Sequence, residues 1–147
     1  PSDLGHCNLF HALDSSRLAR ALDTRFKDAD KKLDCLVQVN VSGEASKFGL
    51  EPTEVDAFLD EIAECSNVRI RGFMTLASPA PNPEQVRPQF ARLRRILEAS
   101  IDRLVPDSLP ILSMGMSGDF HVAIEEGATH VRVGSAVFGS RSYGTTK

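Results

Sequence analysis

Two turns rich in glycine and serine lie close together near the C-terminal end of the sequence. The first spans residues 113–119 (SMGMSGD), and the second is Gly134-Ser135-Ala136. Glycine lets backbone N–H groups approach a ligand closely, and the free amides at the start of a helix attract phosphate. Ser117 and Ser135 each add a hydroxyl group. The pattern predicts a phosphate site without a basic residue, although the same residues also make ordinary tight turns.

Arg132 lies between these features in a strand pattern, THVRV, that should be covered on both sides. Alternation places its side chain on the same face as His130, opposite the two valines. A charge in such a strand needs a partner. Two interpretations stay open: a structural salt bridge to Asp119 or Glu125, and a guanidinium directed into the fold toward a ligand.

Five strand patterns alternate with helix patterns and would position these residues. The strands are expected at 8–13, 33–41, 68–76, 109–113 and 129–133. Asp14 and Ser117 are the predicted N-caps of the first and fourth helices. Alternation of this kind implies a parallel sheet in a single α/β domain, residues 1–147. An open five-stranded sheet fits the length, and so do about five of the eight units of a (β/α)8 barrel, which needs roughly 250 residues.

Composition excludes several classes of protein. The chain has 147 residues, 41% of them hydrophobic and 25% charged, which predicts a folded globular protein. A net charge of −3 does not indicate the basic surface that binds nucleic acid. No apolar run approaches the roughly 18 residues of a membrane span. Cys7, Cys35 and Cys65 are spaced too widely for a zinc site or disulfide framework. We therefore expect reduced thiols and a cytoplasmic protein.

The segment LSMGMSGDFHVAIEEGATHVRVGSAVFGSR resembles the C-terminal signature of the pyridoxal 5′-phosphate (PLP) homeostasis family, relatives of the alanine racemase N-terminal barrel. Three further blocks match in the right order: HALDSSRLARAL (11–22), VQVNVSGEASKFGL (37–50) and RIRGFMTLAS (69–78). The resemblance covers residues 9–141 and leaves residues 1–8 unmatched. It implies a partial PLP-binding (β/α)8 TIM-type barrel with about the last five βα units.

The same resemblance implies a PLP site. Ser117 and the amides of Gly134 and Ser135 would hold the phosphate, and Arg132 would face the pyridine nitrogen. The other predicted cofactor-binding residues are Asn40 and Met74 near the ring, Ser113 near the phosphate end, and Met116. A guanidinium has no acceptor and stays protonated, so it does not encourage protonation of the pyridine. A neutral pyridine is a weaker electron sink, which suits holding PLP better than carbanion chemistry.

The sequence departs from the family at the Schiff-base lysine. In the family this lysine lies in a Ser-Lys block at the end of the first strand, and an Asn-Lys block follows later. Neither block occurs here, so we expect a truncated chain that begins around the fourth strand. Lys47 is the possible substitute, although a lysine on such a loop is more often simply solvated. No catalytic or metal-binding residue is predicted, and His121 and His130 are expected to be structural.

Three functions fit these observations. The first is a non-catalytic carrier in intracellular PLP homeostasis, with PLP and PLP-requiring apo-enzymes as partners. The second is a PLP-dependent, amino-acid racemase-like enzyme, which would need a lysine base and an acid such as Tyr143, the single tyrosine. The third is a non-functional fragment stabilised by self-association. A sheet cut from a barrel exposes two edges, so a homodimer through those edges is expected.

Overall fold

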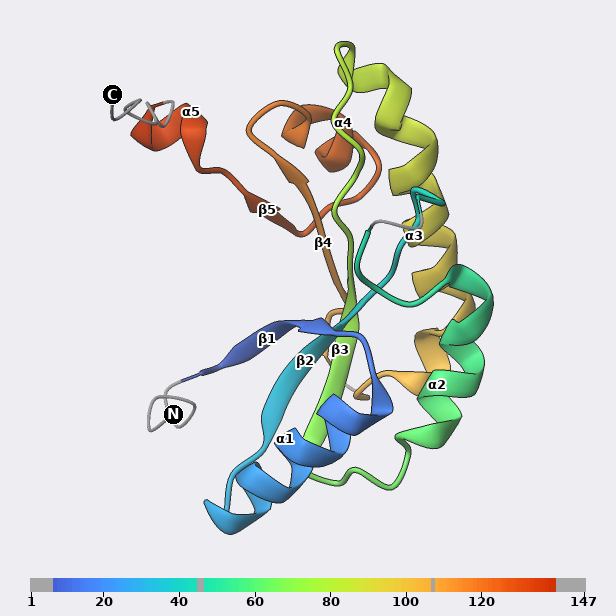
Figure 1. Cartoon of the computed structure of the whole chain (residues 1–147), viewed down its shortest axis with the longest axis vertical. Coiled ribbons are helices and arrows are strands. Elements are labelled where there is room, and N and C mark those ends of the chain that lie inside the picture. The colour runs from blue at the N-terminus through green and yellow to red at the C-terminus, as the bar shows by residue number, and fades with distance from the viewer. Residues whose placement is uncertain (1–6, 45–46, 107, 140–147) are drawn as a thin grey trace, which may run out of the picture.

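A computed structural model describes residues 7–44, 47–106 and 108–139 of the chain. The described residues contain five strands: β1 (Leu9–Leu13), β2 (Leu33–Gln38), β3 (Val68–Met74), β4 (Ile111–Met116) and β5 (His130–Arg132). They form one sheet in the order β1-β2-β3-β4-β5, and every pairing is parallel. Figure 1 shows helices α2 and α3 along one side of this sheet, with β1 and β5 reaching toward the other side.

The sheet is curled into half of a barrel. This confirms the predicted partial barrel of about five βα units, and a five-stranded parallel sheet, the alternative, describes it equally well. Strand order follows sequence order because each strand returns through a helix to its neighbour, as in a (β/α) barrel. The two edges of the described sheet are therefore its first and last strands.

Helices follow each strand. They are α1 (Ser16–Asp28), α2 (Val55–Glu61), α3 (Arg87–Ala99), α4 (Phe120–Glu125) and α5 (Ser135–Phe138), with short 3-10 turns at Pro52–Glu54, Pro83–Val86 and Ile101–Arg103. The prediction of Asp14 as the first N-cap was wrong. Ser15 is the N-cap, because its backbone is extended and its carbonyl accepts the first helical bond, from Ala19 N–H.

The predicted cap of α4 was also wrong. Asp119, not Ser117, is the N-cap of this helix, and its Oδ1 accepts a hydrogen bond from Met116 N–H at 2.6 Å. This bond closes the turn after β4 on itself. The hydroxyl of Ser117 is then free to contact the neighbouring loop.

The two faces of the sheet differ in character. On the helix-covered face, Cys35 and Val37 of β2 and Val39 just after it pack into the hydrophobic core. The core also contains Phe58, Leu59, Phe73, Phe90, Leu93, Leu112 and Met114. Leu36 and Gln38 alternate with these residues along β2 and lie on the other, concave face. This concave face contains most of the predicted ligand-binding side chains.

Three further observations on the described residues concern helix length, metal-binding groups and cysteines. No helix in the described ranges is long and apolar enough to span a bilayer. Within those ranges, no group of three or more metal-binding side chains is arranged around a common point. The three cysteines are free, and burial raises the pKa of the Cys35 thiol to about 12, so this thiol stays protonated.

Candidate functional site

The two glycine and serine turns lie side by side at the C-terminal ends of β4 and β5. The backbone N–H groups of Gly134 and Ala136 both donate to Ser117 Oγ, each at 3.2 Å. Gly118 and Gly134 border free space, since a Cβ atom added at either would meet nothing within 4 Å. The two amides are bonded to Ser117 Oγ, whose own hydrogen is left to donate to an oxyanion beside them. The structure thus brings the two turns together, with Ser117 of the first turn bonded to amides of the second.

A cavity of about 210 Å³ adjoins the first of these turns. It is lined by Met116, Gly118 and Asp119 and by apolar residues of the segment 77–86. The turn is therefore accessible from this side as well as from the concave face.

Arg132 extends from β5 across β4 to β3. Its Nη1 donates to Ser113 Oγ at 2.6 Å and to the Ser113 carbonyl at 3.1 Å, and its Nη2 donates to the Thr75 carbonyl at 2.7 Å. Burial lowers the pKa of Arg132, and the nearby Asp119 carboxylate opposes this effect. A guanidinium stays protonated in proteins, so Arg132 is a fixed, half-buried cation.

The predicted salt-bridge alternatives for Arg132 are used elsewhere. Glu125 is paired with Arg87 at 2.5 Å, and Asp119 caps its own turn. Arg132 is instead held by neutral oxygens. In the described part of the chain its hydrogen bonds use Nη1 and Nη2, which leaves Nε–H for a ligand.

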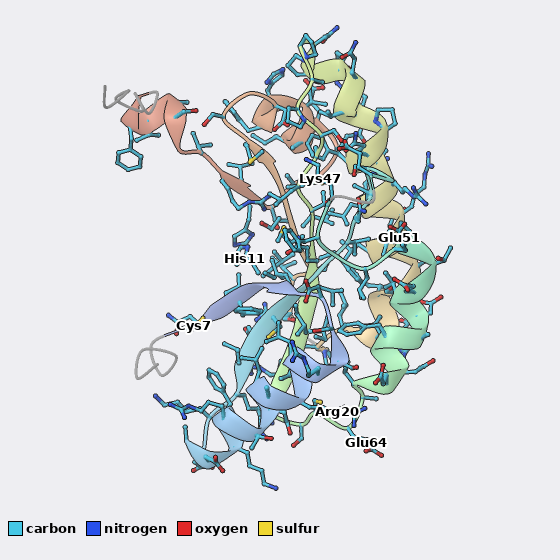
Figure 2. The ribbon with its side chains drawn as sticks, viewed as in Figure 1. Cys7, His11, Arg20, Lys47, Glu51 and Glu64 are labelled. Carbon is cyan, nitrogen blue, oxygen red and sulfur yellow. The ribbon has the colours of Figure 1, made fainter. Side chains whose placement is uncertain are left out.

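His11 joins the site although sequence reasoning did not select it. Its Nδ1 lies 3.1 Å from Ser113 Oγ, and its ring centroid is 6.4 Å from that of His130 in an edge-to-face arrangement. Figure 2 shows His11 extending from β1 into the concave side of the sheet. Burial first, then the charges of Arg132 and His130, lowers the pKa of His11. The sequence signal available for His11 was the alternation of side chains along β1, and alternation does not identify a hydrogen-bond partner.

Two predicted methionines lie next to these polar groups. Met74 is the register partner of Ser113 in the neighbouring strand and is 5% exposed. Met116 is the partner of Arg132 and is 38% exposed. The structure therefore brings both methionines beside the side chains predicted to contact the ligand.

Asn40 and Lys47 belong to a different cluster, the loop after β2. The Asn40 amide donates to the Glu44 carbonyl at 2.9 Å and to Glu51 Oε1 at 3.3 Å, and its Oδ1 accepts from Ser42 Oγ at 2.7 Å. Lys47 lies on the same loop, as Figure 2 shows. Neither side chain, among the described residues, has a hydrogen bond with Ser113, Ser117 or Arg132. Their roles at a ligand stay predictions.

The site has two levels along the same pair of strands. Ser113 and Arg132 meet at one level, and Ser117 meets Gly134 and Ala136 at the other. At about 3.3 Å per residue, β4 spans roughly 10 Å from Ser113 to Met116, the residue before Ser117. This arrangement fits an elongated ligand with a planar, polar group at one end and a phosphate at the other.

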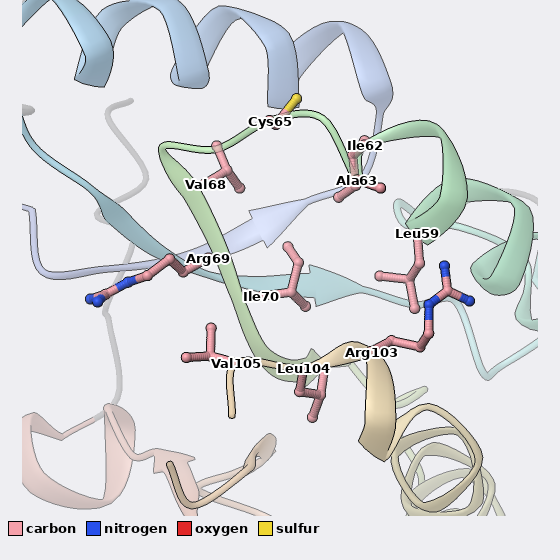
Figure 3. Close-up of a pocket in the computed structure, with 10 residues that line it drawn as sticks. All are labelled: Leu59, Ile62, Ala63, Cys65, Val68, Arg69, Ile70, Arg103, Leu104 and Val105. Carbon is pink, nitrogen blue, oxygen red and sulfur yellow. The ribbon is translucent and has the colours of Figure 1, made fainter. Parts of the chain in front are cut away.

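A second cavity, of about 290 Å³, lies at the opposite end of β3 (Figure 3). The arginines at its rim already have carboxylate partners: Arg69 binds Asp34 at 2.6 Å, and Arg103 binds Asp60 at 2.5 Å. The charges of both arginines are thus paired, and the N-terminal face of a barrel serves stability rather than catalysis. We assign no ligand to this cavity.

Comparison with known proteins decides the family. The model of the alanine racemase N-terminal domain matches residues 2–142. The chain belongs to this family. The pyridoxal phosphate homeostasis protein of Aquifex aeolicus (strain VF5) is 43% identical over 140 residues, which cover 95% of this chain and 61% of that protein. The family predicted from the sequence is thus confirmed.

Solved structures agree with membership of the alanine racemase N-terminal domain family. PipY of Synechococcus elongatus PCC7942, with PLP bound, is 31% identical with a TM-score of 0.80, over 93% of this chain and 63% of PipY. Alanine racemase from Corynebacterium glutamicum has a TM-score of 0.67 at 18% identity, over 88% of this chain and 36% of the racemase, and supports the fold alone. The chain spans about three fifths of the Aquifex protein (61%) and of PipY (63%).

Proposed function

We propose that this chain binds PLP and acts as a non-catalytic carrier in PLP homeostasis. The observation that carries the proposal is the pair of turns whose amides converge on Ser117, with the Arg132 guanidinium fixed on the same two strands. The PLP bound to PipY and the name of the Aquifex homeostasis protein support this choice of ligand.

The residues present fit PLP at both levels. The phosphate level is the group around Ser117, and the ring level is the group formed by Ser113 and Arg132. Ser117 and the backbone amides from Gly134 to Ala136 would bind the phosphate, because amide and hydroxyl donors stabilise a dianion without a basic residue. Arg132 would donate Nε–H to the pyridine nitrogen, with Met74 and Met116 beside the ring. When bound, PLP supplies an aldehyde and an electron-accepting ring.

Arg132 suits a carrier, although it does not exclude a racemase, since the related racemases use a similar contact. A guanidinium keeps the ring nitrogen unprotonated, which makes the ring a weaker electron sink. Tyr143, the residue that a racemase mechanism would need as an acid, lies outside the described residues. The partial fit to racemases is a similarity of fold.

Replacing Ser117 with Ala tests the phosphate level. We expect PLP to bind about tenfold more weakly, because one hydroxyl hydrogen bond to a charged group is lost, worth about 1.5 kcal/mol net. Pyridoxal, which lacks the phosphate, should bind the variant and the wild type equally. Fluorescence titration with both ligands measures this. The control is Ser66→Ala, an exposed serine between α2 and β3, which should change neither affinity.

The outcome that contradicts the proposal is specific. If wild-type protein binds PLP no better than pyridoxal, the two turns hold no phosphate. If Ser117→Ala weakens both ligands equally, the serine acts on the fold and not on the phosphate.

Lys47 has no assigned role in holding PLP, and binding through the two levels alone is reversible. Borohydride reduction of the PLP complex, followed by peptide mapping, tests this point. Recovery of PLP on Lys47 would show that the loop after β2 closes onto the ligand and would restore the enzyme alternative.

Two further partners belong to the same proposal. A carrier must release PLP to apo-enzymes that require it, which places the chain in the cytoplasm with those enzymes.

The outer strands β1 and β5 offer edges for a second copy, and Val137 and Phe138 are 67% and 88% exposed beside β5. Sedimentation velocity would detect such a homodimer, and a monomer at all concentrations would exclude it.

A further inference from the structure

A chain of three side chains crosses the concave face of the sheet. Arg132 of β5 donates to Ser113 Oγ of β4, and Ser113 Oγ lies 3.1 Å from His11 Nδ1 of β1. The strands β2 and β3 separate β1 from β4 in the sheet, and His11 and Ser113 are 102 positions apart in sequence. The curl of the sheet therefore brings an edge strand into contact with the opposite half of the face.

The protons in this chain fix its direction. Arg132 can only donate, so Ser113 Oγ accepts from it. The single hydrogen of the Ser113 hydroxyl is then available to His11, which accepts it on Nδ1 when its ring carries a proton on Nε2 alone. Donation by Ser113 strengthens its oxygen as an acceptor for Arg132, because chained hydrogen bonds polarise one another.

We propose that His11 is a positioning residue, which holds Ser113 and through it the Arg132 guanidinium in place for the ligand ring, and that it does so only while Nδ1 is unprotonated. The contact of Arg132 with a ring rests on the proposed function. The hold of His11 on Arg132 does not, since it is a property of the ligand-free protein.

Protonation of His11 would turn its Nδ1 from a hydrogen-bond acceptor into a donor. Nδ1–H and Arg132 would both donate to Ser113 Oγ, and two cations would share one oxygen. The groups that face His11 offer no compensation: β4 contributes the neutral Ser113, and β5 contributes Arg132 and the titratable His130. Asp119, before α4, acts on Arg132 rather than on His11.

The direction of the pH effect follows from this environment. The pKa of His11 lies below its ordinary value of 6.5, so the folded protein favours the neutral ring. The stability that the neutral His11 ring contributes is complete above pH 6.5 and is lost as the pH falls through the lowered pKa. We expect the ordering of Arg132 to be lost over the same range.

Three variants separate the possibilities. His11→Asn keeps an acceptor oxygen near the position of Nδ1 and cannot be protonated. His11→Leu removes the acceptor, and His130→Asn removes the other nearby titratable group. In each ligand-free protein, the side-chain ¹⁵N–¹H signal of Arg132 reports whether the guanidinium is fixed. The affinity for PLP between pH 5 and 8 is measured in parallel.

We expect wild type and His130→Asn to lose the ordered Arg132 signal on acidification, while His11→Asn keeps it. His11→Leu should lack that signal at every pH. For PLP, the wild type should bind about as tightly as His11→Asn at pH 8 and about fivefold more weakly than it at pH 5. Titration of the PLP phosphate affects both proteins alike and cancels in this ratio.

The inference is overturned if His11→Leu retains the wild-type Arg132 signal, or if the pH dependence disappears in His130→Asn and persists in His11→Asn. Failure of the proposed function has a different signature. The Arg132 signal would then respond to His11 as expected while no variant binds PLP, which would support the positioning of Arg132 and reject PLP as the ligand.

Discussion

Arg132→Leu is expected to weaken PLP binding about 30-fold, which corresponds to about 2 kcal/mol. The side chain is the cation at the ring level, and it is held by Ser113 and by the Thr75 carbonyl rather than by a carboxylate. Its charge is therefore not neutralised by an acid and is available to a ligand. Isothermal titration calorimetry with PLP measures the loss.

Arg132→Lys separates charge from geometry. Lysine keeps the positive charge but lacks the planar fork that bridges Ser113 and Thr75 while presenting a further N–H. We expect it to recover only part of the lost affinity. Arg20→Leu is the control, since Arg20 is exposed on α1 and pairs with Glu61.

Both ring-level variants need a check of the fold. Leucine at position 132 leaves the Ser113 and Thr75 carbonyls without the guanidinium, so thermal unfolding must be recorded for each variant. Unchanged PLP affinity in a folded Arg132→Leu protein would contradict the proposed ring contact. It would leave the phosphate level, tested at Ser117, unaffected.

Sequence reasoning succeeded where a local pattern decides the structure. Alternation of side chains along a strand is such a local pattern. The same rule placed Arg132 on the face of His130, and both side chains lie near Ser113 or His11. The periods of helices and strands depend on residues close in sequence, so the sequence alone is enough to read them.

Partner choice could not be predicted, because it depends on the curl of the sheet. Arg132 had two acidic candidates within 13 residues, Asp119 and Glu125, yet it binds oxygens of Thr75 and Ser113, 57 and 19 positions away. Thr75 follows β3, two strands from β5, and a side chain reaches across β4 to it only when the sheet bends. A one-dimensional pattern carries no information on that bend.

Competition between similar residues also limited the prediction. Ser117 and Asp119 can both cap a helix, and they lie two positions apart. Asp119 is the N-cap residue, with its carboxylate bonded back to Met116 N–H, and Ser117 accepts from the amides of Gly134 and Ala136 instead. Asn40 shows a related limit: its amide hydrogen bonds to Glu44 and Glu51 in the loop after β2 were not predicted, and its place near the ring stays a prediction.

The turn that presents Ser117 depends on Gly115, and Gly115→Ala is expected to destabilise the protein by about 3 kcal/mol. Gly115 has a φ of +92°, which L-residues rarely adopt, and an added Cβ would lie 2.6 Å from Ala123 Cβ and 3.0 Å from Phe120 Cα. Positive φ costs about 1–2 kcal/mol and overpacking about 1–3 kcal/mol. Urea unfolding monitored by circular dichroism measures the change.

Gly118→Ala provides a matched control three residues along the same turn. Its φ lies outside the left-handed region, and an added Cβ meets nothing within 4 Å, so we expect a change within about 0.5 kcal/mol. Gly115→Ala should also move α4 away from β4 and with it the hydroxyl of Ser117. PLP affinity should then fall while pyridoxal affinity is unchanged. Equal stability of the two variants would show that α4 does not pack on the end of β4 as closely as the structure indicates.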